Sequence, residues 1–227
     1  MTRRDNLDRC SECRMHSTLC ICPLVPALAP RTRLALLVHQ REIGKPTNTG
    51  RLAARCLARS SVTVIGARDH VAVLPGVEPH EQALLLYPAD DAVSITVYAN
   101  SDKPIVLFVP DGSWRQAHKM RRRQPGLATL PCVIVPQLAA SEYRLRNEPR
   151  DGGLSTLEAI ARALAILEGD AGLAVETALL QIFKIMVDRT LWLRGQVGDA
   201  QVTGGLPEAA REANPRSTPA RRRGAPT

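Results

Sequence analysis

IVLFVPDGSWRQAHKMRRR, residues 105–123, is the stretch of sequence that decides the fold. Its first five residues, 105–109, are all apolar, which is typical of a strand buried on both faces of a parallel sheet. Pro110 ends this run, and the sequence from Ser113 to Arg123 is helix-like. A buried strand followed directly by a helix is the repeating unit of α/β proteins.

The alternation of strands and helices continues on both sides of this stretch. Short apolar runs predict further strands at residues 34–38, 62–66, 84–87 and 132–135. Helices are predicted at residues 49–59, 155–168 and 175–195, whereas the period of residues 93–98 is ambiguous. We therefore expect an α/β domain over residues 31–197, with a mainly parallel sheet flanked by helices.

The composition is that of a globular protein with a basic surface. Of 227 residues, 44% are hydrophobic and 23% are charged, and these values exclude a mostly disordered chain. The net charge of +8 favours a polyanionic partner, and nucleic acid is the commonest polyanion of the cytoplasm. The alternative is an ordinary solvated basic surface. The aromatic fraction of 3% argues against RNA binding by an extended aromatic platform.

Several protein classes are excluded because their sequence signals are missing. No apolar run approaches the roughly 18 residues that span a bilayer, and no apolar segment follows the first arginines as in a secretory signal. We therefore expect a cytoplasmic protein without a membrane partner. The sequence also lacks a P-loop, a glycine-rich dinucleotide motif, an H-E-x-x-H motif and a G-x-S-x-G motif.

Four of the six cysteines lie close together near the N-terminus, with the spacing C-x2-C-x6-C-x-C. Clustered thiols in a reducing compartment favour a metal site over disulfides, and four thiolates match the tetrahedral preference of zinc. The alternative is a redox-sensitive or incidental cluster in a loop. We expect residues 1–30 to form a zinc-binding head and linker. Its expected metal ligands are Cys10, Cys13, Cys20 and Cys22.

Residues 198–227 differ in composition from the rest of the chain. They are rich in proline, glycine, alanine and arginine and contain few residues that form a core. We expect a disordered basic tail in which Arg221, Arg222 and Arg223 form a loose phosphate-binding patch.

The residues that follow the strand at 105–109 are the strongest candidates for a functional site. Asp111, Ser113 and Trp114 lie at the carboxyl end of this strand, which is the edge where open α/β sheets bind ligands. A carboxylate, an aromatic ring and a basic helix together suit a nucleotide base within a phosphate backbone. The alternative is structural, with Asp111 capping the helix and Trp114 packing against it.

Two further segments carry polar residues at the start of a predicted helix. Thr47, Asn48 and Thr49 precede a helix whose free amides suit a phosphate, and any of the three is also a plain N-cap. Ser155 and Glu158 form the S-x-x-E pattern of a capping box. The glycines before it would also let a backbone approach a small ligand closely.

Six motifs in order resemble one family, the DTW-domain proteins, which are tRNA-uridine aminocarboxypropyltransferases. They are the cysteine pairs C-x2-C and C-x-C, T-N-T-G-R-L at 47–52, Y-P-A at 87–89, P-D-G-S-W at 110–114, Y-R-L-R at 143–146 and S-T-L-E-A at 155–159. The resemblance covers residues 10–197. The chain departs from the D-x-T-W pattern only in Ser113, which replaces threonine and keeps the hydroxyl.

The resemblance implies a SPOUT-like α/β fold with a C-terminal trefoil knot that holds S-adenosylmethionine. The implied reaction transfers the 3-amino-3-carboxypropyl group to N3 of a tRNA uridine and releases 5′-methylthioadenosine. The implied catalytic residues are Asp111 and Trp114. The implied contacts to S-adenosylmethionine are Tyr87, Pro88, Pro110, Ser113, Leu154, Ser155 and Thr156. The implied RNA contacts are Arg51, Arg115, Lys119, Arg144 and Arg146.

Two other functions stay open at the level of sequence. One is an RNA methyltransferase, or an aminocarboxypropyltransferase acting on ribosomal RNA, that uses the same S-adenosylmethionine. The other is a zinc-headed RNA-binding module without catalysis. The identity of the reaction products separates these possibilities, and a monomer is the favoured oligomeric state.

Overall fold

The structure, a computed structural model, describes residues 8–66, 72–136, 143, 145 and 153–213. Its centre is a six-stranded sheet in the order β2-β1-β5-β3-β6-β4, in which every neighbouring pair of strands is parallel. The strands are β1 (Arg33–His39), β2 (Ser60–Ile65), β3 (Gln82–Leu86), β4 (Val93–Ser94), β5 (Ile105–Asp111) and β6 (Cys132–Ile134). The predicted α/β architecture with a parallel sheet is confirmed.

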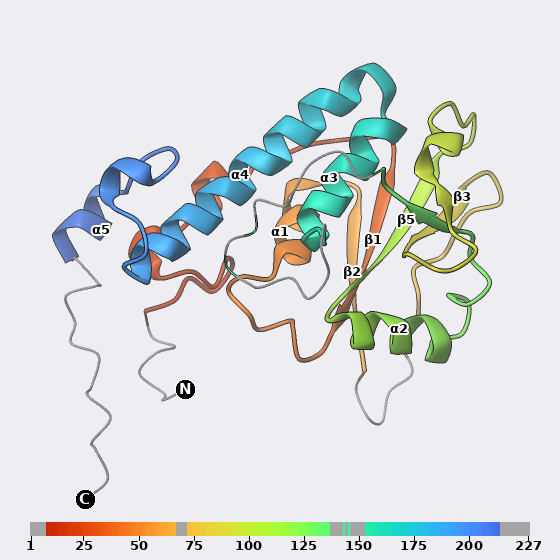
Figure 1. Cartoon of the computed structure of the whole chain (residues 1–227), viewed down its shortest axis with the longest axis horizontal. Helices are drawn as coiled ribbons and strands as arrows, with labels where there is room; N and C mark the ends of the chain where they lie inside the picture. Colours follow the sequence, from red (N-terminus) through yellow and green to blue (C-terminus); the bar gives the residue numbers. More distant parts are fainter. Residues whose placement is uncertain (1–7, 67–71, 137–142, 144, 146–152, 214–227) are drawn as a thin grey trace, which may run out of the picture.

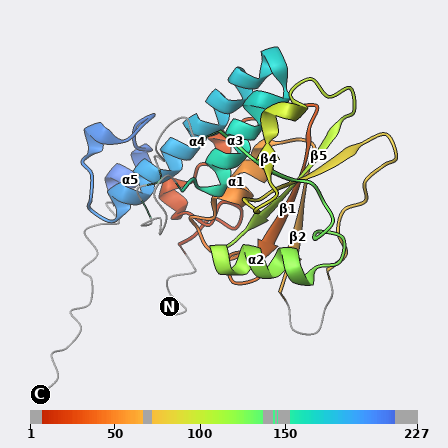
Figure 2. The ribbon, with the colours of Figure 1, turned by 45° about the vertical axis from the view of Figure 1, so that its right-hand side comes forward.

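Helices cover both faces of the sheet. On one face lie α1 (Thr49–Cys56), α3 (Thr156–Leu167) and α4 (Gly172–Leu193), and on the other lies α2 (Trp114–Arg123) (Figures 1 and 2). The residues of β5 alternate between the two cores, since Leu107 packs with α3 and α4 whereas Phe108 packs with α2. Burial on both faces explains why residues 105–109 are uniformly apolar.

Two predicted elements differ in detail. Helix α1 ends at Cys56 rather than at Arg59, because Leu28 pairs with the residues that follow: its amide donates to Cys56 O and its carbonyl accepts from Ala58 N. The ambiguous segment 93–98 divides into the short strand β4 and a 3-10 helix, Ile95–Tyr98. In the described part of the chain, no helix combines the length and apolar character that crossing a membrane requires.

The cysteine-rich segment does not form a separate unit. Met15, Leu19 and Ile21 are buried in the same core as α1, α3 and α4. The guanidinium of Arg189, near the C-terminal end of α4, donates a hydrogen bond of 2.8 Å to Cys20 O. Residues 8–30 are therefore part of the main domain, and the expected boundary at residue 30 is absent because apolar side chains between the cysteines complete the core.

The prediction that disorder begins at residue 198 is wrong. The chain forms a 3-10 turn (Asp199–Gln201) and helix α5 (Glu208–Ala213), which packs against the 3-10 helix Ser17–Leu19. Val202, Leu206 and Ala210 are buried, and their four-residue spacing was too sparse to stand out in the composition. Arg221, Arg222 and Arg223 lie outside the described residues.

Two hydrogen bonds between α4 and this C-terminal segment anchor the segment. Trp192 Nε1 donates to Asp199 Oδ1 at 2.7 Å, and Thr203 Oγ1 donates to Asp188 Oδ2 at 2.6 Å. Both Trp192 and Asp188 are buried in α4, so removing residues 199 and 203 would take a partner from each.

We predict that truncation after Val197 lowers the free energy of unfolding by about 3 kcal/mol or more, since three buried apolar side chains and these hydrogen bonds are lost. Truncation after Ala213 should leave it unchanged. Chemical denaturation of both variants measures the difference, and equal stability of the two truncated proteins would contradict the packing of α5.

Candidate active site

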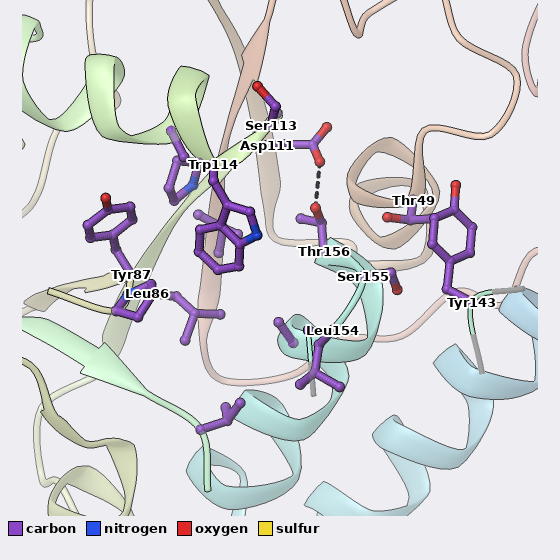
Figure 3. A pocket seen from close by; sticks show the side chains of 18 of the residues that line it. Thr49, Leu86, Tyr87, Asp111, Ser113, Trp114, Tyr143, Leu154, Ser155 and Thr156 are labelled. Atoms are coloured by element: carbon purple, nitrogen blue, oxygen red, sulfur yellow. Dashed lines mark hydrogen bonds between the residues drawn. The ribbon is translucent and has the colours of Figure 1, made fainter. Parts of the chain in front are cut away.

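A cavity of about 740 Å³ opens at the carboxyl ends of the central strands. The residues that line it follow β3, β5 and β6 or begin α1, α2 and α3 (Figure 3). They include residues 86–88, 109–115, 133–136, 47–49 and 153–156. The volume lies within the range of about 300–1,000 Å³ that is typical of small-molecule sites. Because all the strands are parallel, these turns meet at one edge of the sheet.

Asp111 lies at the point where three elements meet. It ends β5 and is 5% exposed, with Oδ1 accepting a hydrogen bond of 2.6 Å from Thr156 Oγ1 (Figure 3). Its other carboxylate oxygen, Oδ2, accepts a hydrogen bond from Asn48 Nδ2. Thr156 begins α3 and Asn48 caps α1, so one carboxylate joins the end of the central strand to the starts of two helices.

Serine and asparagine side chains cap the helices that face the cavity. Ser113, not Asp111, caps α2 and forms a capping box with Gln116. Ser155 caps α3 and forms the predicted capping box with Glu158. Asn48 is the cap of α1, where its Oδ1 accepts a hydrogen bond of 2.7 Å from Arg51 N. The structural reading in which Asp111 caps α2 is therefore wrong.

Three aromatic side chains line the cavity. The indole of Trp114 extends into it from the first turn of α2 (Figure 3). The Tyr87 hydroxyl lies 3.4 Å from His118 Nδ1, and the Arg121 guanidinium lies 5.8 Å from the centre of the Tyr87 ring. Tyr143 donates a hydrogen bond of 2.9 Å to Thr47 O. The cavity therefore offers flat apolar surfaces next to buried polar groups.

All the predicted catalytic and S-adenosylmethionine-binding residues line this one cavity. They are Tyr87, Pro88, Pro110, Asp111, Ser113, Trp114, Leu154, Ser155 and Thr156. Of the predicted RNA contacts, Arg115 lies at the cavity and Lys119 is exposed on α2. Arg51 is half-buried, with Nη1 donating 2.6 Å to Ile43 O, so it holds the loop between β1 and α1. Arg144 and Arg146 lie outside the described residues.

Some lining residues were not singled out in the sequence. Residues 133–136 include the end of β6 and the two residues after it, and their place at the same edge follows from the predicted parallel strand. Glu42 is a second buried carboxylate at the cavity, where its Oε1 accepts a hydrogen bond of 2.5 Å from Lys45 Nζ. No local pattern marks Glu42, because its burial depends on the path of the loop between β1 and α1.

The four clustered cysteines bring their sulfur atoms together. The four Sγ atoms lie within 4.8 Å of one another, with Cys10 and Cys22 at 3.6 Å and Cys13 and Cys20 at 3.8 Å. A tetrahedral zinc site with Zn–S bonds of about 2.3 Å has sulfur atoms about 3.8 Å apart. The donor set therefore fits zinc. The backbone amide of Cys13 lowers the pKa of Cys10 to about 6, whereas burial raises the pKa of Cys13 and raises that of Cys20 to about 12. Cys10 therefore ionises more readily than Cys13 and Cys20, and metal binding would have to displace the protons of those two thiols.

Two cations from α1 and α4, half-buried Arg55 and buried Arg189, support this cluster. Arg55, in the last turn of α1, donates a hydrogen bond of 3.3 Å from Nη2 to Cys22 Sγ. Arg189 holds the backbone carbonyl of Cys20. Four thiolates around a divalent metal carry a formal charge of −2, and the two guanidinium groups offset that charge.

The DTW domain family model matches residues 7–191, and the chain belongs to this family. Among curated relatives, tRNA-uridine aminocarboxypropyltransferase 2 of Drosophila melanogaster is 31% identical over 169 residues, which cover 71% of this chain and 67% of that protein. The protein of the same name from Macaca fascicularis is 32% identical over 70% of this chain, a match that spans only 56% of that protein.

Two further comparisons extend these findings. tRNA-uridine aminocarboxypropyltransferase A of Arabidopsis thaliana is 28% identical over 78% of this chain and 79% of that protein. Among solved structures, the SAM-dependent rRNA:acp-transferase Tsr3 from Vulcanisaeta distributa has a TM-score of 0.44 and 16% identity, covering 81% of this chain and 89% of that chain.

We predict that Gly50→Ala destabilises the protein by about 1–3 kcal/mol. A Cβ atom at residue 50 would lie 2.9 Å from Asp111 Cγ and 3.0 Å from Leu36 Cδ1, and this crowding outweighs the better helix propensity of alanine, which is about 1 kcal/mol. Gly44→Ala is the matched control, because a Cβ there meets nothing within 4 Å. Denaturation curves that place both variants at the same stability would contradict the tight contact at Asp111.

Proposed function

We propose that this protein transfers the 3-amino-3-carboxypropyl group of S-adenosylmethionine to N3 of a uridine in tRNA and releases 5′-methylthioadenosine. The observation that carries the proposal is the meeting of the family motifs at 47–52, 87–89, 110–114 and 155–159 around one cavity. The curated relatives named above as tRNA-uridine aminocarboxypropyltransferases support the same reaction.

The cavity has the size and the lining that S-adenosylmethionine needs. Its walls combine apolar residues with the hydroxyls and backbone groups of the turns after β3 and β5 and before α3. We assign the contacts to S-adenosylmethionine to the seven residues that the family resemblance implies. They are Tyr87, Pro88, Pro110, Ser113, Leu154, Ser155 and Thr156. A SPOUT-like trefoil knot, built from the turns after β3 and β5 and before α3, is part of this proposal.

The reaction requires that N3 of the uridine be oriented toward Cγ of S-adenosylmethionine and that the N3 proton be removed. The N3–Cγ bond forms while the Cγ–S bond breaks, the bonding electrons leave with sulfur, and N3 loses its proton. The sulfonium group supplies the leaving-group reactivity, so the protein contributes positioning and a proton acceptor. Trp114 extends into the cavity and provides the flat surface for the uracil ring or for a wall beside the sulfonium.

We assign the role of proton acceptor to Asp111. It lines the cavity, and its hydrogen bonds from Thr156 and Asn48 favour the ionised carboxylate that a base requires. The same hydrogen bonds fix the position of the carboxylate relative to α1 and α3. Arg115 and Lys119 hold RNA phosphates at the cavity entrance, with Arg144 and Arg146 as further proposed contacts.

We also propose that Cys10, Cys13, Cys20 and Cys22 bind one structural zinc ion. The sulfur distances match a tetrahedral site, and Arg55 and Arg189 lie beside it. All four tetrahedral positions are then filled by sulfur, so this site holds the N-terminal segment in place.

Asp111→Asn should lower kcat by about 10²–10⁴-fold, the usual contribution of a general base. Thr156→Val removes one hydrogen bond to the same carboxylate but leaves the carboxylate in place, so it should lower kcat far less. Both variants are compared at saturating S-adenosylmethionine, because Thr156 is also an assigned contact to that substrate. Turnover of unmodified tRNA with S-adenosylmethionine is followed by mass spectrometry of both products. Equal losses of kcat in the two variants would contradict the role of Asp111 as a base and leave it a structural role only.

The products decide between the proposed reaction and its alternatives. Methylthioadenosine together with an aminocarboxypropyl uridine supports the proposal. S-adenosylhomocysteine together with a methylated base would replace it by methyl transfer, modification of ribosomal RNA alone would change the substrate, and tight RNA binding without product would leave a binding module.

Purified protein should contain about one zinc ion per chain, as four thiolate ligands imply. Cys13→Ser should lose the metal and weaken tRNA binding more than S-adenosylmethionine binding, because the segment it holds lies apart from the residues that line the cavity. Cys132→Ala is the control, since Cys132 lies on β6 and outside the cluster. Metal analysis that finds no zinc in fully active protein would contradict the assignment.

A further inference from the structure

A cluster of cations lies near His39. His39 ends β1, Arg41 and Lys45 follow in the loop to α1, and Lys119 lies three residues after Gln116 of α2, whose side-chain amide contacts His39. Arg41, Lys45 and Lys119 are exposed, whereas His39 is half-buried. Glu42, between the two loop cations, turns inward and lines the cavity. The cluster therefore lies at the same edge of the sheet as the candidate active site.

The imidazole of His39 is held in one orientation. Its Nδ1 accepts a hydrogen bond of 3.2 Å from Arg41 N and lies 3.2 Å from Gln116 Nε2. Gln116 is itself fixed, because its Oε1 accepts a hydrogen bond of 2.7 Å from Ser113 N in the capping box of α2. Two donors at Nδ1 place the proton of the neutral ring on Nε2. The ring is thus a positioned N–H donor tied to the D-G-S-W turn.

The cluster has an excess of positive charge. Among the described residues whose charges act most strongly on His39, Glu42 is the carboxylate, and it pairs with Lys45. Burial and the charges of Arg41, Lys119 and Lys45 lower the pKa of His39 below its usual range, against the opposite effect of Glu42. Bringing like charges together costs free energy, and an anion bound among them would offset that cost.

The positive surface continues along α2. Arg115 and Arg122 are exposed and lie four residues before and three residues after Lys119, which places all three on one side of the helix. A separation of seven residues spans about 10 Å along a helix. The cluster at His39 thus meets a basic stripe at its middle member, Lys119, and the stripe reaches the cavity at Arg115. A repeating anion fits such a stripe better than a single small one.

We propose that His39, Arg41, Lys45 and Lys119 form a binding site for a backbone phosphate of the RNA substrate, next to the nucleotide that enters the cavity. This inference rests on the proposed function, because it assumes an RNA substrate. Arg41, Lys45 and Lys119 supply the charge, and the Nε2–H of His39 donates to a phosphate oxygen. Contacts to phosphate carry no base information, so the site sets the position of the strand and not the choice of sequence.

The double variant Arg41→Gln/Lys119→Gln tests the site. Both side chains are exposed, so the fold should be retained, and melting temperatures check this. At about 0.1 M salt we expect the affinity for an in vitro transcribed tRNA to fall about tenfold, and the slope of log K against log salt to become shallower by about 1–2. KM for tRNA should rise by a similar factor, because the lost contacts act on RNA binding.

Arg59→Gln/Lys103→Gln is the matched control. It removes the same two charges from exposed positions before β2 and β5, at the opposite edge of the sheet, and should leave affinity and salt slope as in the wild type. Equal losses in both double variants would overturn the site in favour of a general effect of net charge. Wild-type affinity in Arg41→Gln/Lys119→Gln would overturn it as well. A wild-type protein that makes no aminocarboxypropyl uridine would instead contradict the proposed function.

The titration of His39 gives an independent readout. The His39 signal in NMR spectra is the imidazole signal that disappears in His39→Gln. Binding of the same tRNA should raise the pKa of His39, because a phosphate adds negative charge to an environment set by Arg41, Glu42, Lys45 and Lys119. By linkage, tRNA affinity should rise as the pH falls through this pKa, and the rise should vanish in His39→Gln. An unchanged pKa in the complex would overturn the phosphate contact.

Discussion

The buried carboxylate of Asp111 holds the candidate site together. A carboxylate removed from water is costly unless it is hydrogen-bonded, and Asp111 accepts from Asn48 and from Thr156. These bonds join the end of β5 to the N-cap of α1 and to the first turn of α3. The three elements come from distant parts of the chain. Gly50 makes the approach of α1 possible, because a Cβ atom there would crowd Asp111 Cγ at 2.9 Å.

Helix α1 connects this carboxylate to the cysteine cluster. Its cap, Asn48, contacts Asp111, and Arg55 in its last turn contacts Cys22 Sγ. Eight residues of helix span about 12 Å, so the two sites lie at opposite ends of one short rigid element. The cysteine segment is also held by Arg189 of α4, and α5 packs beside it. Both described ends of the chain therefore support the helices that position the cavity.

The residues that cap helices are also the residues that line the cavity. Ser113 and Ser155 satisfy the first amides of α2 and α3, and both face the space assigned to S-adenosylmethionine. Gln116 also has two roles, since it completes the capping box of α2 and orients His39. A structural cap and a binding group are thus compatible in one side chain, because capping uses the backbone of one turn whereas the ligand would approach from the cavity.

The sequence by itself determined what depends on neighbouring residues. Apolar runs located the strands, their uniform burial indicated a parallel sheet, and the S-x-x-E pattern at Ser155 located the start of α3. Because parallel strands end at one edge, the motif residues were expected to meet there. Only the tertiary structure decided which groups are in contact. Asp111 accepts hydrogen bonds from Asn48 and Thr156, and Arg51 donates to a loop carbonyl. The burial of Glu42 also depends on the tertiary structure. It also placed residues 8–30 and 198–213 in the main domain, since sparse apolar side chains acquire a core only from α1 and α4.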